Sequence, residues 1–438
     1  MRLLVLALLM PALFVAACRP GGESAPPAGE APREEAPATP RTLYQDPAVA
    51  PEDLTEFASL ALPAWRILAS EQPTLVLLSQ DPLLFLIPDS LRNQARELAL
   101  RGSRQELSDH GAPDRPEPYL LPVQTLRAAL DAGLFARVLW VLPVTEGPER
   151  LDVELFRQQL LYAGQVSEEE AATVEAQDNG FRLRIAGIPI DVAVPSALPE
   201  IDGPVVLHVD LSHFQNLYRN EVKTPVFELM RQALSDLYGR GWDVRAATHS
   251  LGQAEGRVTT DMRFLGHRLT RILADPAMLE RPLPPLWQEQ AEIIYLATFL
   301  EMDKVLEKAA HLAMRAPQDA PAHFELYRAL RARRAGTEAL AALARAVALD
   351  PGYAAEYLNL AALARGRELP EQELEMLEIA KGLDPANPFV GLRIAELQIE
   401  LGAPEQARRH LDELSRLPWS PVYFPDVPEL IESMKQNL

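Results

Sequence analysis

Apolar and polar positions in the middle of the chain follow two alternating patterns. Continuous apolar runs, typical of strands that are buried on both faces, predict β-strands at 74–79, 137–143, 188–194, 205–209 and 243–248. Between these runs, apolar residues recur at helical spacing and predict helices at 91–101, 123–132, 151–161, 168–176, 225–238 and 261–274. Strands that alternate with helices of this length predict an α/β domain over 44–285, with a mostly parallel sheet and helices on both faces.

The last third of the chain has a second pattern, which is helical throughout and interrupted by regularly spaced prolines. Pro317, Pro351, Pro385 and Pro418 follow one another at intervals of 34, 34 and 33 residues, and two helices fit into each interval. A proline stops a helix because it lacks an amide hydrogen and clashes with the preceding turn. The pattern predicts an all-α solenoid of stacked helix pairs over 286–438.

This repeat resembles the tetratricopeptide repeat. In the third unit, Tyr357, Leu360 and Ala361 stand where the family has an aromatic residue, a leucine and a small residue on the first helix. Ala380 and Pro385 match the small residue and the terminal proline of the second helix. The resemblance implies a short superhelix whose first helices line a concave face, and in the family that face binds peptides or partner proteins.

Five polar side chains on the expected concave face are candidates for partner binding, namely Glu325, Arg328, Asn359, Arg365 and Arg393. Their charges are mixed, and the family's carboxylate clamp of Lys and Asn on three helices is not present in full. The array is therefore either a surface for a protein or peptide partner, or a scaffold whose polar residues only keep it soluble. The first unit, 286–317, diverges from the pattern and is predicted to form a cap.

The middle domain carries a weaker resemblance. Residues 204–214 read PVVLHVDLSHF, a buried strand that runs into polar side chains at its carboxyl end. Ligands bind at that end of the strands in open α/β sheets. Together with 119–143 and 242–250, this segment resembles the arginase/deacetylase fold, and in particular a branch whose strand ends in Asp-x-Asp-x-Asp-Phe-Phe. The resemblance implies an arginase/deacetylase-like α/β domain and a metal site at these strand ends.

The sequence departs from that family at the metal ligands. The candidate ligands are His208, Asp210 and His213, with His249 at the end of the next predicted strand. At 79–81 the chain has Ser-Gln-Asp, where the family often has Asp-x-His-x-Asp. A His/Asp cluster of this kind is suited to one zinc ion, and the family resemblance implies zinc or manganese. The alternative, which we prefer, is a degenerate core without cofactor or catalytic activity, whose polar side chains hydrogen-bond to neighbouring loops.

The N-terminus has the pattern of a bacterial lipoprotein. After Arg2, the apolar stretch 3–17 is too short for a stable membrane span and reads as a signal peptide. It ends in Val-Ala-Ala-Cys, which resembles the lipobox, and Cys18 is the only cysteine of the chain. The resemblance implies that residues 1–18 are a signal peptide and that a lipid is attached to Cys18. A plain secretory signal peptide with an incidental cysteine is the alternative.

The segment 19–43 is rich in Pro, Ala and Glu and almost lacks large apolar side chains, so it predicts an extended linker. Position 19 is Arg and not Asp, which by resemblance to enterobacterial sorting favours the outer membrane over the inner membrane. We therefore expect a lipid-anchored protein of the cell envelope, bound to the membrane through its anchor.

Composition excludes several other classes of function. The 438-residue chain has a formal net charge of −20, and such a surface repels nucleic acid phosphates. No Gly-x-Gly-x-x-Gly, Gly-x-x-x-x-Gly-Lys-Ser/Thr or Gly-x-Ser-x-Gly motif is present, so nucleotide-binding and α/β-hydrolase sites lack support. Two hypotheses remain. The first is a lipid-anchored scaffold that binds a partner through its repeats and carries a non-catalytic α/β domain. The alternative is a periplasmic or surface metal-dependent hydrolase with an altered metal site.

Overall fold

The computed structural model describes residues 55–144, 152–178, 180–214, 226–251 and 260–438, and Thr42–Leu438 form one compact unit. The expected signal peptide, Cys18 and the linker 19–43 lie outside the described residues, so lipid attachment stays a prediction. Among the residues that are described, no helix combines the length and apolar character that a membrane crossing requires.

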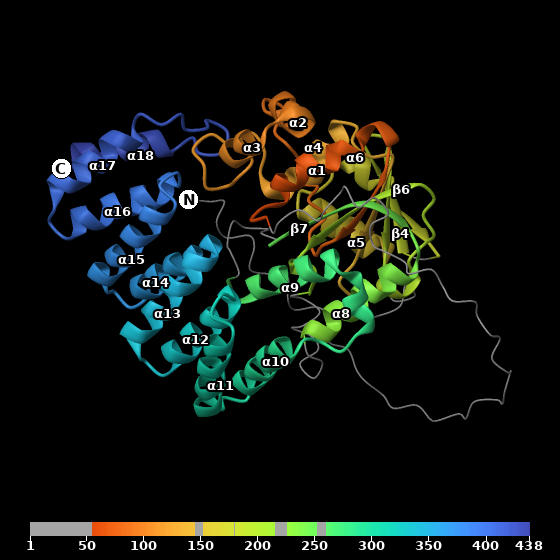
Figure 1. Ribbon diagram of the computed structural model, residues 1–438. Helices are drawn as coiled ribbons and strands as arrows, with labels where there is room; N and C mark the ends of the chain where they lie inside the picture. Colours follow the sequence, from red (N-terminus) through yellow and green to blue (C-terminus); the bar gives the residue numbers. More distant parts are fainter. Residues whose placement is uncertain (1–54, 145–151, 179, 215–225, 252–259) are drawn as a thin grey trace. The chain divides into compact units, whose positions relative to one another are not determined.

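Within the described ranges, seven strands form one mixed sheet in the order β3-β4-β5-β2-β1-β6-β7 (Figure 1). Strands β5, β2, β1, β6 and β7 run parallel, and β4 and β3 extend the sheet in antiparallel orientation. The strands are β1 (Thr74–Leu78), β2 (Arg137–Val141), β3 (Glu175–Gln177), β4 (Gly180–Ile185), β5 (Ile188–Ala193), β6 (Pro204–Asp210) and β7 (Asp243–Ser250). The prediction of a mostly parallel sheet is confirmed, and all five predicted strands are present.

The antiparallel edge corrects one prediction. The sequence predicts a helix over 168–176, but only α6 (Glu168–Ala171) is helical, and the chain then forms β3. Every residue of β3 is exposed, so no apolar pattern marks it. In β4, Phe181, Leu183 and Ile185 are buried and alternate with less buried residues, as expected for a strand with one buried face.

Helices cover both faces of the sheet because successive strand residues point to opposite sides. On one face, Leu77 and Trp140 belong to a core shared with helices that precede β6. These are α1 (Leu62–Ile67), α2 (Arg92–Arg101), α3 (Arg104–His110), α4 (Thr125–Asp131) and α5 (Val153–Tyr162). On the other face, Val76 and Leu207 pack with α8 (Val226–Gly239) and α9 (Arg263–Ala274).

The rest of the chain, all of it described, consists of four helix pairs and a final helix (Figure 1). The pairs are α10 (Pro285–Thr298) with α11 (Met302–Arg315), α12 (Ala320–Ala332) with α13 (Gly336–Leu349), α14 (Ala355–Arg365) with α15 (Pro370–Leu383), and α16 (Pro388–Glu400) with α17 (Pro404–Leu414). The final helix is α18 (Val427–Gln436). We call α10–α17 the repeat array. It begins at the predicted domain boundary, but Trp287 of α10 packs into the core under the sheet, so the two parts share a core.

The turn inside each helix pair has the same unusual backbone. Leu300, Arg334, Glu368 and Gly402 have φ of 60°, 60°, 58° and 74°, and they stand 34 residues apart. Side chains other than glycine rarely adopt this left-handed conformation, so its recurrence marks one structural repeat. The predicted helical array is confirmed, and the divergent unit 286–317 folds as a complete helix pair.

Candidate functional site

His208 and Asp210 point to the same face of β6, and hydroxyl groups of β7 occupy them. His208 Nδ1 lies 2.8 Å from Thr248 Oγ1, and His208 Nε2 lies 3.2 Å from Ser250 Oγ. Ser250 in turn donates a hydrogen bond of 2.9 Å to Asp210 Oδ2. The strand register explains the pairing, because His208 stands opposite Thr248 and Asp210 stands opposite Ser250. All four side chains are buried.

The direction of these hydrogen bonds assigns the tautomer of His208. The indole N–H of Trp65 donates to Thr248 Oγ1 at 3.0 Å, so the Thr248 hydroxyl can donate to His208 Nδ1. The Ser250 hydroxyl donates to Asp210, so its oxygen accepts from the Nε2–H of His208. Burial lowers the pKa of His208 to about 3 and keeps the ring neutral. Both ring nitrogens are thus engaged inside the core, and neither is left to bind a metal.

The other two candidate ligands lie elsewhere. His249 stands opposite Val209 in the register and so points to the other face of the sheet, where its Nε2 lies 2.7 Å from Thr270 Oγ1. His213 follows β6, and its buried ring contacts Phe214 edge-on. Neither nitrogen of His213 has a hydrogen-bond partner in the described part of the chain. Burial lowers the pKa of His213 to about 3 and that of His249 to about 4.

The structure therefore does not bring His208, Asp210, His213 and His249 together as the predicted zinc or manganese site. Among the described residues, no group of three or more His, Cys, Asp or Glu side chains is placed to hold a metal ion. The alternation of side chains along β6 and β7 separates the two faces, and hydroxyl partners take the places that metal ligands would need.

The order of the parallel strands reverses between β1 and β6, which is where open α/β sheets bind ligands. At this edge the loops bind each other. The amide of Gln80 donates to Ser212 Oγ at 3.2 Å, and the amide of Leu83 donates to Asp81 Oδ1 at 2.7 Å. Burial raises the pKa of Asp81 to about 7 and also raises that of Asp210. These polar groups hold the strand ends together.

The turns between successive helix pairs contact the α/β domain, and we call this side of the array the docked edge. In three of these turns, an aspartate near a periodic proline pairs with an arginine of the α/β domain. The pairs are Asp319 with Arg268, Asp350 with Arg263, and Asp384 with Arg115, at 2.7, 2.5 and 3.4 Å. Beyond the last pair, the amide of Ser420 donates to the carbonyl of Pro116 at 2.8 Å, and Tyr423 donates to Gln124 at 3.0 Å.

The pair of Arg263 and Asp350 is the most buried part of the docked edge. Arg263 also donates to Glu56 at 2.6 Å, and His267 Nε2 lies 2.7 Å from Asp350. Burial alone would raise the pKa of Asp350, but the hydrogen bonds from His267 and Arg263 outweigh it and hold that pKa well below its usual range. A Cβ atom added to Gly352 would lie 1.9 Å from the guanidinium carbon of Arg263. Glycine at this position therefore makes room for the arginine.

Part of the predicted partner-binding face contacts the α/β domain instead. Asn359 Nδ2 lies 2.8 Å from Glu356 Oε2, and the hydroxyl of Thr260 donates to the same oxygen at 2.8 Å. Arg328 lies 3.6 Å from Asp261. The first helices of the second and third pairs thus have an intramolecular neighbour in residues 260–261, which the sequence does not predict.

Arg365 and Arg393 stabilise the array itself. Both donate to the buried carboxylate of Glu373, Arg365 at 2.8 Å and Arg393 at 2.8 and 3.0 Å. Arg393 also pairs with Glu396 at 2.8 Å. Of the five predicted partner-binding residues, only Glu325 and Arg328 line the groove that the array leaves open.

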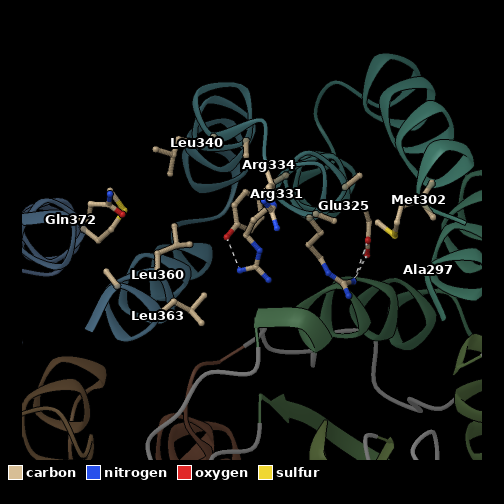
Figure 2. Close-up of a pocket in the computed structure, with 18 of the residues that line it drawn as sticks. Ala297, Met302, Glu325, Arg331, Arg334, Leu340, Leu360, Leu363 and Gln372 are labelled. Atoms are coloured by element: carbon tan, nitrogen blue, oxygen red, sulfur yellow. Dashed lines mark hydrogen bonds and ion pairs between the residues drawn. The ribbon is translucent and has the colours of Figure 1, made fainter. Parts of the chain in front are cut away.

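That groove, of about 1140 Å³, follows the ends of the helices where each of the first three pairs turns back (Figure 2). We call it the repeat groove. Its apolar lining includes Met302, Leu340, Leu360, Leu363 and Met376. Its charged lining consists of Arg328, Arg331, Arg334, Arg367, Glu325 and Glu375.

The four arginines of the groove differ in their partners. Arg328 pairs with the buried Glu325, and Arg331 pairs with Glu356 at 2.8 Å. The exposed side chains of Arg334 and Arg367 have neither an ion pair nor a hydrogen bond in the described part of the chain. Sequence reasoning missed both, although the basic clusters at 331–334 and 365–367 recur at nearly the repeat spacing in an acidic chain.

No protein-family model and no curated protein matches this sequence. Similar folds occur among solved structures. A crystal structure of MamA is 16% identical, covers 41% of this chain and 92% of its own, and has a TM-score of 0.24. A TPR protein of Thermus thermophilus, TTC0263, is 18% identical over 40% of this chain and 90% of its own, with a TM-score of 0.22. The APC/C hetero-tetramer Cut9-Hcn1 is 11% identical over 52% of this chain and 39% of that chain, with a TM-score of 0.24. With TM-scores this low, the repeat architecture rests on the helix pairs and their 34-residue turns.

Proposed function

We propose that this protein is a scaffold of the cell envelope that binds a protein partner in its repeat groove. The observation that supports this best is the groove itself, which combines apolar side chains with two unpaired arginines on one side of the array. Its length over three helix pairs suits a peptide segment better than a compact metabolite, because small-molecule sites are closed clefts with few polar groups.

The α/β domain serves in this proposal as the support of the array. It contacts the turn after each helix pair, and its polar strand ends are engaged in hydrogen bonds within the protein. Its resemblance to arginases and deacetylases then describes a fold without the family's metal ligands. A metal-dependent hydrolase has no supporting observation in the described residues.

Site-specific crosslinking in membranes of the native host tests the groove as the binding surface. A photoreactive residue replaces Leu363, which lines the groove and is 48% exposed, or Leu383, which lies outside it and is 47% exposed. We expect a distinct crosslinked protein from position 363 and none from position 383. The same products from both positions, or none from position 363, would refute the proposal.

The lipid anchor at Cys18 is the second part of the proposal. It rests on the lipobox-like Val-Ala-Ala-Cys sequence and on the absence of any other cysteine in the chain. Several acyl chains hold a protein firmly because each buried CH₂ group contributes about 0.8 kcal/mol. We expect the wild type to incorporate labelled palmitate and to sediment with the outer membrane, and Cys18→Ser to do neither. Incorporation that persists in Cys18→Ser would refute the anchor.

A further inference from the structure

The repeat groove has the opposite charge to the protein that carries it. The whole chain has a formal net charge of −20, whereas the groove is lined by four arginines and only two glutamates. Arg328 is neutralised by Glu325, and Arg331 is neutralised by Glu356. The excess positive charge of the groove is therefore concentrated on Arg334 and Arg367.

The backbone presents these two arginines to solvent at the mouth of the groove. Arg334 is the left-handed residue of the turn between α12 and α13, and Arg367 lies in the equivalent turn between α14 and α15. Both are exposed, so neither side chain stabilises the core. Elsewhere in the array, Arg365 and Arg393 are each neutralised by Glu373. The unpaired state of Arg334 and Arg367 is thus a local property of the groove.

We propose that the repeat groove selects an acidic segment of its protein partner, with carboxylates held by Arg334 and Arg367 and apolar side chains held by Leu340, Leu360 and Leu363. The inference rests on the proposed function and adds the chemistry of the partner. A guanidinium binds a carboxylate through two parallel hydrogen bonds, which gives both attraction and orientation. The leucines lie on the same lining, so an acidic segment with regularly placed apolar side chains matches both features. The arginines occupy the turns of the helix pairs, away from the concave-face positions of a carboxylate clamp.

A phosphate-bearing partner is the competing source of negative charge. Nucleic acid would have to approach a surface of strongly negative net charge, and it offers no aliphatic side chains for the leucine lining. We therefore assign the groove to a carboxylate-bearing peptide, and the experiment below includes a nucleic acid probe.

Fluorescence anisotropy with synthetic peptides tests the inference on the full-length protein in a mild detergent. The probe is a fluorescein-labelled peptide of Glu, Leu and Ala, compared with versions in which Gln or Lys replaces every Glu and with a single-stranded oligothymidylate. We expect the Glu peptide to bind about tenfold more tightly than the Gln peptide, and the Lys peptide and the oligonucleotide to bind weakest. Raising the salt from about 0.05 to about 0.5 M should weaken binding of the Glu peptide, because these arginines are exposed.

Matched variants separate the groove from the general charge of the protein. The double variant Arg334→Gln with Arg367→Gln should bind the Glu peptide about tenfold more weakly. The control Arg408→Gln with Arg409→Gln removes the same charge from the exposed surface of α17, outside the groove, and should leave binding unchanged. Leu363→Asp places a charge on the apolar lining and should reduce binding of every peptide that uses the groove.

The outcomes distinguish this inference from the proposed function. If the Gln or Lys peptide binds as tightly as the Glu peptide and Leu363→Asp abolishes that binding, the groove stands and its preference for acid is refuted. Equal binding of the oligonucleotide, or equal losses in the two double-arginine variants, also refutes the preference. If no peptide binds, the inference fails, and crosslinking from position 363 still decides whether the groove binds a partner.

Discussion

The guanidinium of Arg263 holds the carboxylate of Asp350 through two hydrogen bonds, of 2.5 and 2.7 Å, in a site that is almost closed to water. Arg263 is the first residue of α9, and Asp350 precedes one of the periodic prolines of the array. This bidentate pair joins the two parts of the molecule. A buried pair of this kind is costly to break, because the remaining partner keeps an uncompensated charge away from water.

Replacement of Gly352 tests the docked edge without removing either charge. In Gly352→Ala the new methyl group would overlap the guanidinium of Arg263, so the pair with Asp350 has to shift. We expect the free energy of unfolding to fall by about 2–4 kcal/mol. Urea unfolding followed by circular dichroism measures the change.

The matched control is Gly382→Ala in α15, where an added Cβ meets nothing within 4 Å. Alanine favours a helix over glycine, so this variant should be unchanged or more stable by up to about 1 kcal/mol. Equal stability of the Gly352→Ala and Gly382→Ala variants would show that the Arg263 contact contributes little.

The buried histidines predict how stability depends on pH. Burial lowers the pKa of His213 in the folded protein from 6.5 to about 3, so below pH 6.5 only the unfolded chain takes up this proton. The contribution of neutral His213 to stability is therefore complete above pH 6.5 and is lost progressively as the pH falls towards 3. The variant His213→Leu lacks this loss, so its stability relative to the wild type should improve by about 1.4 kcal/mol per pH unit below pH 6.5.

Urea unfolding at several pH values between 7 and 4 measures this difference. The same replacement at His311, whose side chain is 54% exposed, controls for loss of an imidazole from the surface. A difference between His213→Leu and the wild type that stays constant over this pH range would contradict a neutral, buried His213.

The left-handed turns of the array offer a third test. Glu368 holds a φ of 58° without lining the groove, whereas Gly402 holds 74° at the equivalent turn. Glycine adopts this conformation without steric cost, so Glu368→Gly should raise the free energy of unfolding by about 1 kcal/mol. The reciprocal change Gly402→Ala should lower it by a similar amount, about 1 kcal/mol. Thermal unfolding compares the two, and a shift of the same sign in both would refute the shared turn geometry.

Metal analysis addresses the predicted ligands directly. The two ring nitrogens of His208 are engaged by Thr248 and Ser250, so we expect no stoichiometric zinc or manganese in the purified full-length protein after dialysis against either ion at micromolar concentration. Inductively coupled plasma mass spectrometry measures the metal content. One ion per chain that disappears in the double variant His208→Ala with Asp210→Ala would restore the metallohydrolase hypothesis.

The sequence predicts much of this architecture because two physical signals are strong in it. Central strands of a parallel sheet are buried on both faces, so β1 and β2 appear as continuous apolar runs. The prolines at helix ends define the repeat period. The antiparallel strand β3 escapes prediction because it is entirely exposed and carries no pattern.

The candidate site is harder to predict because it depends on which side of the array is occupied. A repeat resemblance assigns partner binding to the first helices, where Asn359 lies, but it contains no information about residues 260–261 that contact the same helices. Likewise, His208 and Asp210 share one face of β6, as alternation requires, yet the hydroxyl groups opposite them decide that they form a core and not a metal site. Long-range pairing of this kind leaves no local signal.

A solenoid of helix pairs normally behaves as a spring, because each pair touches only its neighbours and small changes in their angles accumulate along the stack. Here one rim of the spring is riveted at every turn to a stiff sheet, from Asp319 to Ser420. The stack is therefore splinted, and the opening between its free turns has a set width before any partner arrives. A pull on the bound partner loads the sheet instead of uncoiling the array, so the protein grips as a rigid bracket and not as an elastic one.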